Sequence, residues 1–312
     1  MTAFNPLEHP ICLTTPLRLD PTSAWIEHIP FGMLIVDLMR PRIFVELGTH
    51  TGVSYCAFCQ AVKELELSTE CYAIDTWKGD AHATFYGEEV LLDLRTHHDP
   101  LYKGFSQLLQ STFDDAIPRF ADGSIDLLHI DGFHTYEAVK HDFEAWYPKL
   151  SDEAVILLHD TNVREQDFGV WKLWSELRQQ YSGFEFLHGH GLGVLGVGPE
   201  SGTKLEPFFS ASDEEIEKIR EFFSGVGRNL FMAAGPYKQV RALNRQITEK
   251  EHVIQTLRTQ LDDKEKTMQA TITKKEQEVQ RLMSEAAALY QTRSWRWTKP
   301  FRKLLGLLRS GR

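Results

Sequence analysis

The chain has 312 residues, enough for one large domain and an appendage, and its formal net charge is −10. The charge is uneven, because residues 1–238 carry 18 basic against 36 acidic residues, whereas residues 293–312 carry 7 basic residues and no acid. An acidic body with a basic end argues against a general nucleic-acid binder and favours one localised contact with an anionic partner.

The cysteines and the first residues bear on the cellular compartment. Cys56 and Cys59 form a C-x-x-C pair, a spacing found in redox and zinc sites. No second pair follows, and both residues fall in an expected helix, so small buried apolar residues in a reducing compartment are favoured. The chain does not begin with a basic n-region and an apolar h-region, and no run of about 18 apolar residues occurs. We therefore expect a cytoplasmic protein.

In chain order, residues 1–24 are rich in Pro and Thr and predict an irregular lead-in. Apolar residues at helical spacing predict a helix over residues 25–39, which ends before a proline. The run IFVELGTHTGVS (residues 43–54) combines a short apolar strand, a turn with Gly48 and Gly52, and the start of a helix. Strand, glycine turn and helix open a doubly wound α/β domain, whose ligand lies beyond the carboxyl ends of the strands.

The next predicted strand, CYAID, ends at Asp75. An acid about 20 residues past the glycine turn is placed to hydrogen-bond ribose hydroxyls. A dinucleotide and S-adenosylmethionine (SAM) both fit that arrangement. A dinucleotide turn needs G-x-G-x-x-G so that the backbone can approach a pyrophosphate, whereas here Thr49-His50-Thr51 separates two glycines. The spacing therefore favours the methyl donor.

A polar stretch over residues 76–100 follows, and a long loop that leaves a strand end predicts a lid or a substrate wall. Alternating strand and helix patterns then lead to a closing hairpin. The strands are expected at 105–109, 125–130, 154–158, 184–187 and 192–197, and the helices at 114–120, 136–150 and 170–181. Together they predict an α/β fold with a Rossmann-like, seven-stranded mixed sheet in a domain of residues 25–200.

The residues after this domain change in character. Residues 201–238 predict a helical linker with a capping box that begins at Ser212. Interruptions are expected at its glycines, Gly225, Gly227 and Gly235. Over residues 239–292 apolar residues recur every seven positions, which predicts a C-terminal α-helical coiled coil with a stutter near Ile272. The main stripe is Val240, Ile247, Ile254, Leu261 and Met268.

Such a stripe predicts self-association as a dimer or a trimer, and the alternative is a single amphipathic helix folded back on the domain. Residues 293–312 combine Trp, Phe and Leu with basic residues and predict a basic amphipathic tail. This composition suits an anionic membrane surface, at the inner face of the membrane, or a protein partner such as a glycosyltransferase. A disordered tail is the alternative.

The motif VELGTHTGVS, with Glu46 before a two-glycine turn, resembles the first motif of class I SAM-dependent methyltransferases. The catechol O-methyltransferase-like branch is the nearest resemblance, because it also lacks a middle glycine. The motifs HIDGFHTYEAVKHD, LLHDT and HGLGV are similar to the bacterial methyltransferase family 24, over residues 25–198. The coiled coil and the SWRWTKPFRKL tail resemble C-terminal regions of bacterial surface-polysaccharide enzymes.

The resemblance implies roles for particular residues. Those implied to bind SAM are Glu46, Gly48, Thr49, Gly52, Ser54, Asp75, Ser111 and Asp131. In metal-dependent relatives, acids after the fourth and fifth strands bind a divalent cation such as Mg²⁺, and they match Asp131 and Asp160 here. Those relatives continue with Asp-Asn, whereas this chain reads Asp160-Thr161-Asn162, so the metal is an open question.

Methyl transfer to a hydroxyl requires alignment of the oxygen with the methyl group and removal of a proton. His134, three residues past Asp131, is the best-placed candidate base, and His159 is the second. Either histidine could instead be hydrogen-bonded within the loop framework. Asp131 could orient His134, or it could join Asp160 in holding a cation that acidifies the hydroxyl. The residues leave both options open.

These patterns together predict a SAM-dependent O-methyltransferase that acts on a hydroxyl of a sugar or a surface-glycan precursor, in polysaccharide biosynthesis. One alternative is an NAD-dependent oxidoreductase, which the missing G-x-G-x-x-G opposes. The other is a non-catalytic methyltransferase-like scaffold that its coiled coil oligomerises. The intact residues Glu46, Gly48, Gly52 and Asp75 argue against a scaffold.

Overall fold

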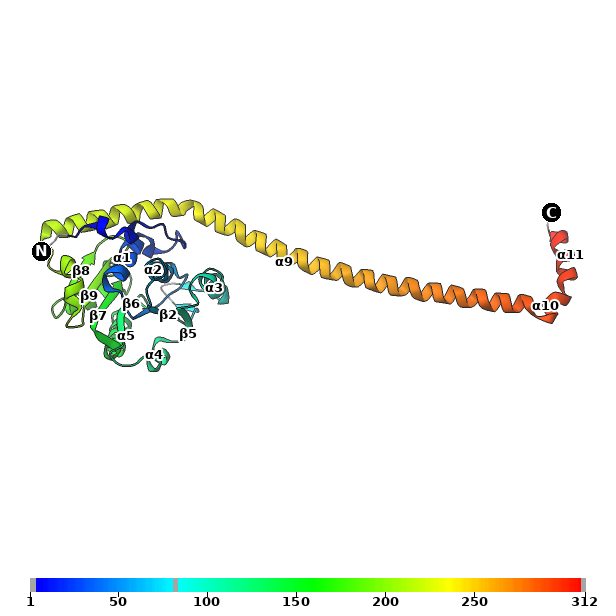
Figure 1. Cartoon of the computed structure of the whole chain (residues 1–312), viewed down its shortest axis with the longest axis horizontal. Helices are drawn as coiled ribbons and strands as arrows, with labels where there is room; N and C mark the ends of the chain where they lie inside the picture. The colour runs from blue at the N-terminus through cyan, green and yellow to red at the C-terminus, as the bar shows by residue number, and fades with distance from the viewer. Residues whose placement is uncertain (1–3, 81–83, 310–312) are drawn as a thin grey trace. The chain divides into compact units, whose positions relative to one another are not determined.

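Seven strands form one mixed sheet in the computed structural model, which describes residues 4–80 and 84–309 (Figure 1). Across the sheet they are β5 (Ser106–Gln110), β2 (Glu70–Asp75), β1 (Ile43–Leu47), β6 (Ile125–Ile130), β7 (Leu150–His159), β9 (Leu192–Gly196) and β8 (Ser182–Phe186). The pairs from β5 to β7 are parallel, whereas β9 is antiparallel to both β7 and β8. This arrangement confirms the predicted Rossmann-like sheet.

Successive side chains of the central strands point to opposite faces of the sheet, because a strand has a two-residue period. In β7, Val155 and Leu157 belong to one buried cluster, whereas Ile156 and Leu158 belong to the other. Helices that contribute to the first cluster include α1 (Ile29–Met39), α2 (Val53–Glu64) and α3 (Glu88–Tyr102), and those of the second include α5 (Tyr136–Trp146) and α6 (Val170–Leu177). Burial of such a side chain stabilises the folded state by about 1.5–3 kcal/mol. Burial on both faces therefore holds the parallel strands in register and sets the positions at which they end.

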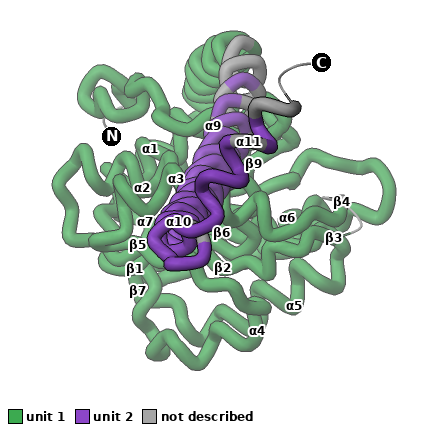
Figure 2. The backbone as a smooth tube through the Cα atoms, turned by 90° about the vertical axis from the view of Figure 1, so that its right-hand side faces the viewer, with its two compact units in different colours: residues 1–240 green, residues 241–312 purple. Residues whose placement is uncertain are grey.

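The chain divides into two compact units, residues 1–240 and residues 241–312, here called unit 1 and unit 2 (Figure 2). The expected lead-in forms two short 3-10 helices, η1 (Pro6–Glu8) and η2 (Pro10–Leu13). Ile11, Cys12 and Leu19 from this segment are buried in the first cluster. These three side chains therefore anchor the lead-in to the core of unit 1, whereas Leu7, Leu13 and Leu17 are exposed.

All four cysteines are buried and unpaired. Burial raises the pKa of the Cys56 and Cys59 thiols well above the ordinary value. Thiols in that state are poor nucleophiles and poor metal ligands, so the C-x-x-C pair is part of the packing of α2, as the sequence favours.

The stretch over residues 76–100 departs most from the sequence prediction. A loop throughout is wrong, because the stretch holds β3 (Gly79–Asp80), β4 (Thr84–Phe85) and most of α3, while residues 81–83 lie outside the described residues. Leu91, Leu94 and His98 recur at helical spacing and are buried in α3. Polar residues between them hide the helical period, and Pro100 lies inside the last turn instead of ending the helix earlier.

Several predicted boundaries also shift. The helix predicted from residue 25 begins as the 3-10 turn η3 (Ala24–His28), and α1 starts at Ile29, because Pro30 suits a first helical turn. The fifth strand of the sheet in chain order, β7, begins four residues earlier than expected, at Leu150. α4 (Phe113–Ala116) is also shorter than predicted and continues as a 3-10 turn, η4 (Ile117–Arg119).

The predicted interruptions after residue 223 are wrong. Two short helices, α7 (Ser201–Lys204) and α8 (Glu206–Phe209), precede α9, which runs without a break from Asp213 to Gln291. Gly227 has a packing reason to be glycine, because a Cβ at this position would lie 2.2 Å from the carbonyl oxygen of Glu27. The glycine therefore marks a close contact of the first part of α9 with η3.

In unit 2, α9 is followed by α10 (Arg293–Trp297) and α11 (Lys299–Arg309). The apolar residues of the predicted stripe whose side chains are described are all exposed, and they are Ile247, Ile254, Leu261 and Met268. The side chain of Val240 lies outside the described residues. Within the described parts of the chain, none of the helices has an apolar stretch long enough to cross a lipid bilayer.

Candidate functional site

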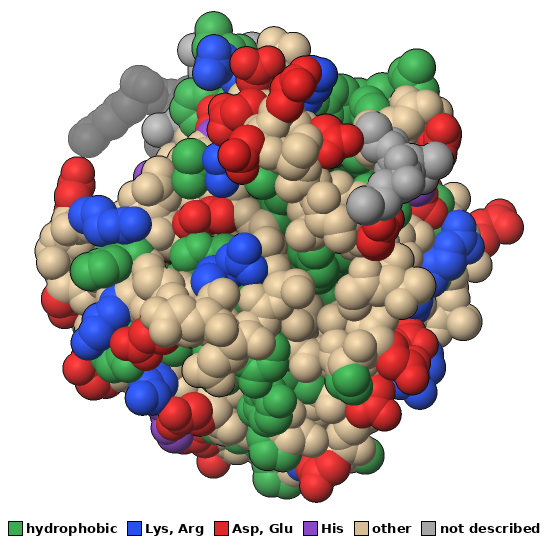
Figure 3. Space-filling view, turned by 90° about the vertical axis from the view of Figure 1, so that its left-hand side faces the viewer, with side chains coloured by type: hydrophobic (Ala, Val, Ile, Leu, Met, Phe, Trp, Pro, Cys, Tyr) green, Lys and Arg blue, Asp and Glu red, His purple; other side chains and the backbone are tan. Residues whose placement is uncertain are grey.

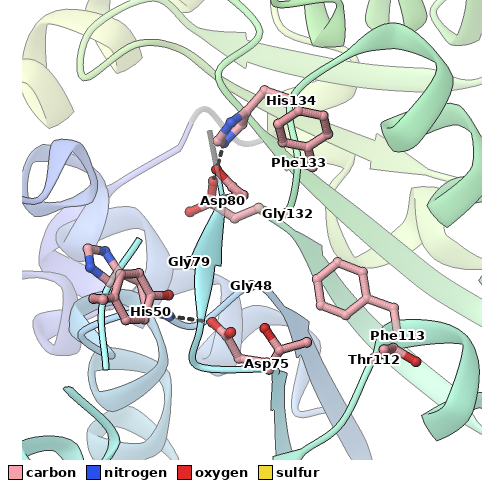
Figure 4. Close-up of a pocket in the computed structure, with 13 residues that line it drawn as sticks. Gly48, His50, Asp75, Gly79, Asp80, Thr112, Phe113, Gly132, Phe133 and His134 are labelled. Carbon is pink, nitrogen blue, oxygen red and sulfur yellow. Dashed lines mark hydrogen bonds and ion pairs between the residues drawn. The ribbon is translucent and has the colours of Figure 1, made fainter. Parts of the chain in front are cut away.

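A pocket of about 260 Å³ lies where β1, β2 and β6 end. Figure 4 shows side chains converging on it from different loops, with Asp75 and Phe113 at one end and Asp80 and His134 at the other. The residues that line it are Gly48, His50, Asp75, Thr76, Gly79, Asp80, Tyr86, Thr112, Phe113, Asp131, Gly132, Phe133 and His134. The pocket thus has the position expected for a ligand of a doubly wound sheet.

The turn after β1 requires glycine at two positions. Gly48 has φ +87°, and a Cβ there would lie 2.0 Å from the carbonyl oxygen of Asp131. Gly52 has φ +73°, and its Cβ would lie 2.5 Å from Leu94. Backbone with positive φ is strained for other residues. The two glycines therefore let the end of β1 meet the end of β6 and let α2 start beneath the pocket.

Asp75 holds the glycine turn in place from the end of β2. One carboxylate oxygen accepts the backbone N–H groups of Thr49 and His50, at 2.9 and 2.8 Å, and the other accepts that of Trp77 at 2.7 Å. Each carboxylate oxygen has two lone-pair sites, so Asp75 retains acceptor capacity toward the pocket. The predicted ribose-binding acid therefore lines the pocket and also supports its wall.

The stretch predicted as a substrate wall supplies Tyr86 to the pocket, and two further aromatic side chains, His50 and Phe113, were not predicted. The His50 ring stacks on Tyr86, with centroids 4.7 Å apart, and the indole N–H of Trp77 donates to the His50 carbonyl at 3.0 Å. Phe113 comes from α4 on the other side of the pocket. These aromatic residues occur in loops and at helix starts with no regular spacing, so no periodic signal points to them.

The predicted acids and histidines meet at the pocket's other end, and we call Asp131, His134, His159 and Asp160 the acid–histidine cluster. Asp131 and His134 line the pocket, whereas His159 and Asp160 do not. His134 Nε2 lies 2.9 Å from Asp160 Oδ2 and 3.5 Å from Asp131 Oδ1. His159 Nδ1 lies 3.2 Å from Asp131 Oδ1 and 3.4 Å from Asp160 Oδ2. Two carboxylates are therefore clamped between two imidazoles from the ends of β6 and β7.

These contacts change the ionisation of the cluster. Burial lowers the pKa of His134, but hydrogen bonds to Asp131 and Asp160 outweigh burial and raise that pKa to about 9. Burial would raise the pKa of both carboxyls, yet the facing His159 and His134 hold each pKa well below its usual range. At neutral pH the cluster therefore contains two carboxylates and a protonated His134.

Both ring nitrogens of His159 face hydrogen-bond acceptors. Its Nε2 lies 3.1 Å from the carbonyl oxygen of Gly189, which can only accept a hydrogen bond. Its Nδ1 faces Asp131 and Asp160, which also only accept when ionised. Both nitrogens therefore donate, and the ring is an imidazolium that positions the two carboxylates. The predicted second base stays a prediction, although this geometry does not favour it.

Glu46 and Ser54, both predicted to bind SAM, do not line the pocket. Glu46 Oε2 lies 2.9 Å from Nδ1 of His129, whose Nε2 accepts the indole N–H of Trp25 at 3.1 Å. Because Trp25 can only donate, Nδ1 of His129 carries the proton and donates to Glu46. Burial raises the pKa of Glu46, and the interactions of this carboxyl with His129 and Ser54 only partly oppose that rise. The pair forms a buried support behind the glycine turn.

Thr49 and Ser111 lie behind the pocket wall. Thr49 is buried and contributes its backbone N–H to Asp75, and Ser111 N–H donates to the backbone carbonyl of Asp75 at 3.0 Å. The next residue, Thr112, lines the pocket and caps α4 by accepting the N–H of Asp115. On this side the pocket is therefore lined by Thr112 and Phe113, one and two residues beyond Ser111.

The cluster has the composition of a divalent-cation site. One ligand atom each from Asp131, His134 and Asp160 lies within 4.8 Å of the others. Carboxylate oxygens suit Mg²⁺ or Mn²⁺, and imidazole suits transition metals. A cation and the proton on His134 would compete for the same place, because a ligating imidazole must be neutral. His134 therefore joins the two predicted ligands as a candidate third one.

A family of known proteins and one curated relative match parts of this chain. Residues 45–161 match the family described as a methyltransferase domain, which confirms the predicted methyltransferase family 24 resemblance over that stretch. Over 219 residues, 70% of the chain, the sequence is 48% identical to an uncharacterized protein, y4gI, of Sinorhizobium fredii. The chain spans 24% of the length of that curated relative.

Solved structures with similar folds share little sequence with the chain. The O-methyltransferase TomG from Streptomyces achromogenes, in complex with SAM, is 12% identical, with 55% of this chain and 79% of that chain covered and a TM-score of 0.42. A methyltransferase from Geobacter sulfurreducens is 14% identical, with 63% and 91% covered and a TM-score of 0.43. Likenesses of this extent carry no argument about a ligand or a reaction.

Proposed function

We propose that unit 1 is a SAM-dependent O-methyltransferase. The observation that carries this proposal is the single pocket shared by two groups of residues within a methyltransferase domain. The Gly48 turn and Asp75 lie at one end, as a SAM site requires, and the acid–histidine cluster lies at the other. An acceptor hydroxyl between them would be close to both the methyl group and a proton acceptor.

The donor end suits an adenosine moiety. Asp75 keeps acceptor capacity for ribose hydroxyls, and Phe113 offers an apolar ring beside the hydroxyl of Thr112. The absence of a side chain at Gly48 leaves backbone exposed to the ligand. The roles of Glu46 and Ser54 in this proposal are indirect, because both support the turn from behind.

In the proposed reaction the acceptor oxygen attacks the methyl carbon, the carbon–sulfur bond breaks, and the sulfonium becomes a neutral thioether. The hydroxyl proton must also leave. Below a pH of about 9 His134 is protonated and cannot take that proton, so the proposed acceptor is the carboxylate of Asp131, which lines the pocket but is a weak base because its pKa is lowered. His134 then orients Asp131 and balances its charge.

A divalent cation offers a second route to the same result. Asp131, His134 and Asp160 would hold it, and when bound it would lower the pKa of the acceptor hydroxyl. Such binding would deprotonate His134, so it should weaken as the pH falls. The requirement for a cation is therefore a matter for direct measurement.

For the acceptor we propose a hydroxyl of a sugar or glycan precursor. Asp80, His50 and Tyr86 place hydrogen-bonding groups and ring faces around an open pocket, which suits a polyhydroxylated ring. The catechol O-methyltransferase-like branch stays a prediction. An NAD-dependent oxidoreductase is disfavoured, because no G-x-G-x-x-G turn approaches the pocket, and a non-catalytic scaffold would not need the paired carboxylates.

We also propose that the coiled-coil stretch of α9 associates with further copies of the chain. Its described apolar stripe is exposed, so the single chain leaves it in water. At roughly 25 cal/mol per Å², pairing such stripes is worth several kcal/mol per chain. A dimer or a trimer would satisfy the stripe.

The test of the reaction uses SAM with a labelled methyl group and a panel of hydroxylated acceptors, with products identified by mass spectrometry. His134→Ala removes the group that orients Asp131, so it should lower turnover by about tenfold or more, the worth of one charge-assisted hydrogen bond, and leave SAM affinity unchanged. His141→Ala is a matched control, because His141 also pairs with an aspartate, Asp114 at 2.9 Å, but is exposed outside the pocket. Label transfer at the wild-type rate in His134→Ala would reject a role for the acid–histidine cluster in the reaction. Activity unaffected by EDTA would reject the requirement for a cation.

A further inference from the structure

The C-terminal segment formed by α10 and α11 has a chemistry unlike the rest of the chain. Residues 293–312 contain 7 basic residues and no acid. On the face of unit 1 drawn in Figure 3, by contrast, acidic and basic side chains are interspersed. We name residues 293–309, the described part of this segment, the basic tail.

Four cations of the basic tail surround one hollow. Arg296, Lys299, Arg302 and Lys303 line it together with Tyr290 from the end of α9, and its volume is about 550 Å³. None of these lining residues is acidic. A concave group of cations without a lining carboxylate is complementary to a phosphate-bearing or otherwise anionic headgroup.

Apolar side chains of the same segment are exposed. Trp297, Phe301 and Leu305 are 83%, 75% and 62% exposed, and they follow one another at intervals of four residues. Residues four apart lie on the same face of a helix, so α11 extends an apolar row that starts at the end of α10. Pro300 does not disrupt this row, because it lies in the first turn of α11, where proline is tolerated.

We propose that the basic tail binds the surface of an anionic lipid membrane. A helix of 11 residues spans about 16 Å, too short for the roughly 30 Å hydrocarbon core, so α11 would lie in the interface rather than cross it. Trp and Phe suit the headgroup boundary, while the cations attract acidic lipids. This inference does not depend on the proposed methyl transfer.

A lipid surface fits these observations better than an acidic protein groove does. The apolar row and the cations occupy one short segment, which is the pattern of interfacial helices with Lys and Arg on the polar face and Trp, Phe and Leu on the other. A protein partner would be expected to offer specific pockets, whereas the hollow here is open and lined by long, flexible cationic side chains. The charge attraction should fall as salt rises.

Vesicle sedimentation of the full-length protein tests the proposal. The probes are phosphatidylcholine vesicles with and without phosphatidylserine, at low and high salt. We expect binding only to vesicles with phosphatidylserine, and weaker binding at high salt. Binding that is equal for both vesicles, or absent from both, would overturn the proposal, even if a protein partner were captured instead.

Two matched variants distinguish the effect of the cations in the basic tail from the effect of the protein's net charge. The first neutralises the hollow with Arg296→Gln, Lys299→Gln, Arg302→Gln and Lys303→Gln, and the second neutralises four lysines of α9 with Lys264→Gln, Lys266→Gln, Lys274→Gln and Lys275→Gln. Since each cation near an acidic surface adds about a fivefold gain, the first should weaken binding roughly a hundredfold or more. The second should bind like the wild type. Equal loss in both variants would show that only net charge matters and would contradict the proposed site.

The apolar row provides an independent readout. Trp297→Ala with Phe301→Ala should weaken binding without removing its salt dependence, because it takes away apolar contact and leaves the cations. Both side chains are exposed, so the helices should keep their circular dichroism signal. Unchanged vesicle binding by this variant would reject insertion of the row into the interface. Inorganic phosphate at matched ionic strength should not compete, and competition would assign the hollow to a free anion instead.

Discussion

Apolar side chains have opposite surroundings in the two units. In unit 1, Phe58 and Leu47 are fully buried, whereas in unit 2 Leu261 and Met268 are 57% and 62% exposed. Both units are rich in regular secondary structure, so helix or strand content does not explain the difference. The two units differ in whether the chain covers its own apolar surface. Since most helix stability in proteins comes from packing of an apolar face, unit 1 should hold its fold alone and unit 2 should depend on what it contacts.

The difference also separates two kinds of function. The pocket of unit 1 is formed by rigid strand ends that tertiary packing holds in register, which is what oriented chemistry needs. The exposed stripe and the basic tail of unit 2 are instead surfaces of helices, and neither forms a pocket at the end of a strand. Chemistry is therefore expected in unit 1 and assembly in unit 2.

The largest contrast should come from removing one buried and one exposed apolar side chain. Phe58 packs on Trp25 and Phe44, with ring centroids 5.3 and 4.4 Å away. Phe58→Ala should lower the free energy of unfolding of unit 1 by about 3–5 kcal/mol. Leu261→Ala should leave that value unchanged and weaken self-association. Denaturant unfolding and light scattering measure the two effects, and a loss of unit 1 stability in Leu261→Ala would break the comparison.

A smaller effect is expected from pH, through Asp142 in α5. Burial raises its pKa to about 7, with His141 opposing and Asp114 adding to the shift. A folded-state pKa raised above the unfolded value means that stability is full below a pH of about 4 and falls as the pH rises through 7. The loss is at most about 4 kcal/mol, and Asp142→Asn should remove it.

Thermal unfolding of wild type and Asp142→Asn from acid to alkaline pH provides the measurement. Their difference should grow as the pH rises from about 4 to about 7 and then level off, with the variant the more stable protein at neutral and alkaline pH. Asp263→Asn in the exposed part of α9 is the matched control from unit 2 and should leave the curve of the wild type unchanged. Parallel curves for wild type and Asp142→Asn would contradict the burial argument.

The next effect in size concerns glycine. Gly48→Ala forces a Cβ onto the Asp131 carbonyl at positive φ, so we expect a loss of about 2–3 kcal/mol in unfolding free energy together with loss of ligand binding. Gly306→Ala in α11 meets nothing within 4 Å and should favour the helix by about 1 kcal/mol. Circular dichroism during thermal unfolding compares the two. A stabilising Gly48→Ala would refute the account of the turn.

The sequence reveals those parts of the site that local geometry dictates. Gly48, Gly52 and Asp75 follow from the needs of a strand–turn–helix unit, whereas the pairing of Asp131 with Asp160 rests on the resemblance to metal-dependent methyltransferases. Of the aromatic wall of His50, Tyr86 and Phe113, only Tyr86 was predicted, because it lies in the stretch expected to form a substrate wall. Its members come from separate loops, and tertiary packing alone brings them together.

The same distinction explains the errors in the fold. α3 is hidden because its buried positions are few and a proline lies in its last turn. α9 continues through glycines that suggest breaks, because Gly227 serves a backbone contact that no sequence pattern displays. The pairing of His159 with Gly189 is likewise a long-range contact. Asp160 and Asp131 outweigh burial and raise the pKa of His159, and the Gly189 carbonyl accepts from the other ring nitrogen, so long-range contacts make His159 an imidazolium.

The central claim, that unit 1 binds SAM at the ends of β1 and β2, is tested most directly by calorimetric titration of the full-length protein. We predict saturable SAM binding with one site per chain, and Asp75→Asn should raise the dissociation constant about tenfold or more, since charge-assisted hydrogen bonds are worth roughly 1.5–3 kcal/mol. Asp126→Asn is the control, because Asp126 is also buried but pairs with Arg42 at the opposite end of β6. Heat from NAD but none from SAM, or equal affinities for wild type and Asp75→Asn, would contradict the account.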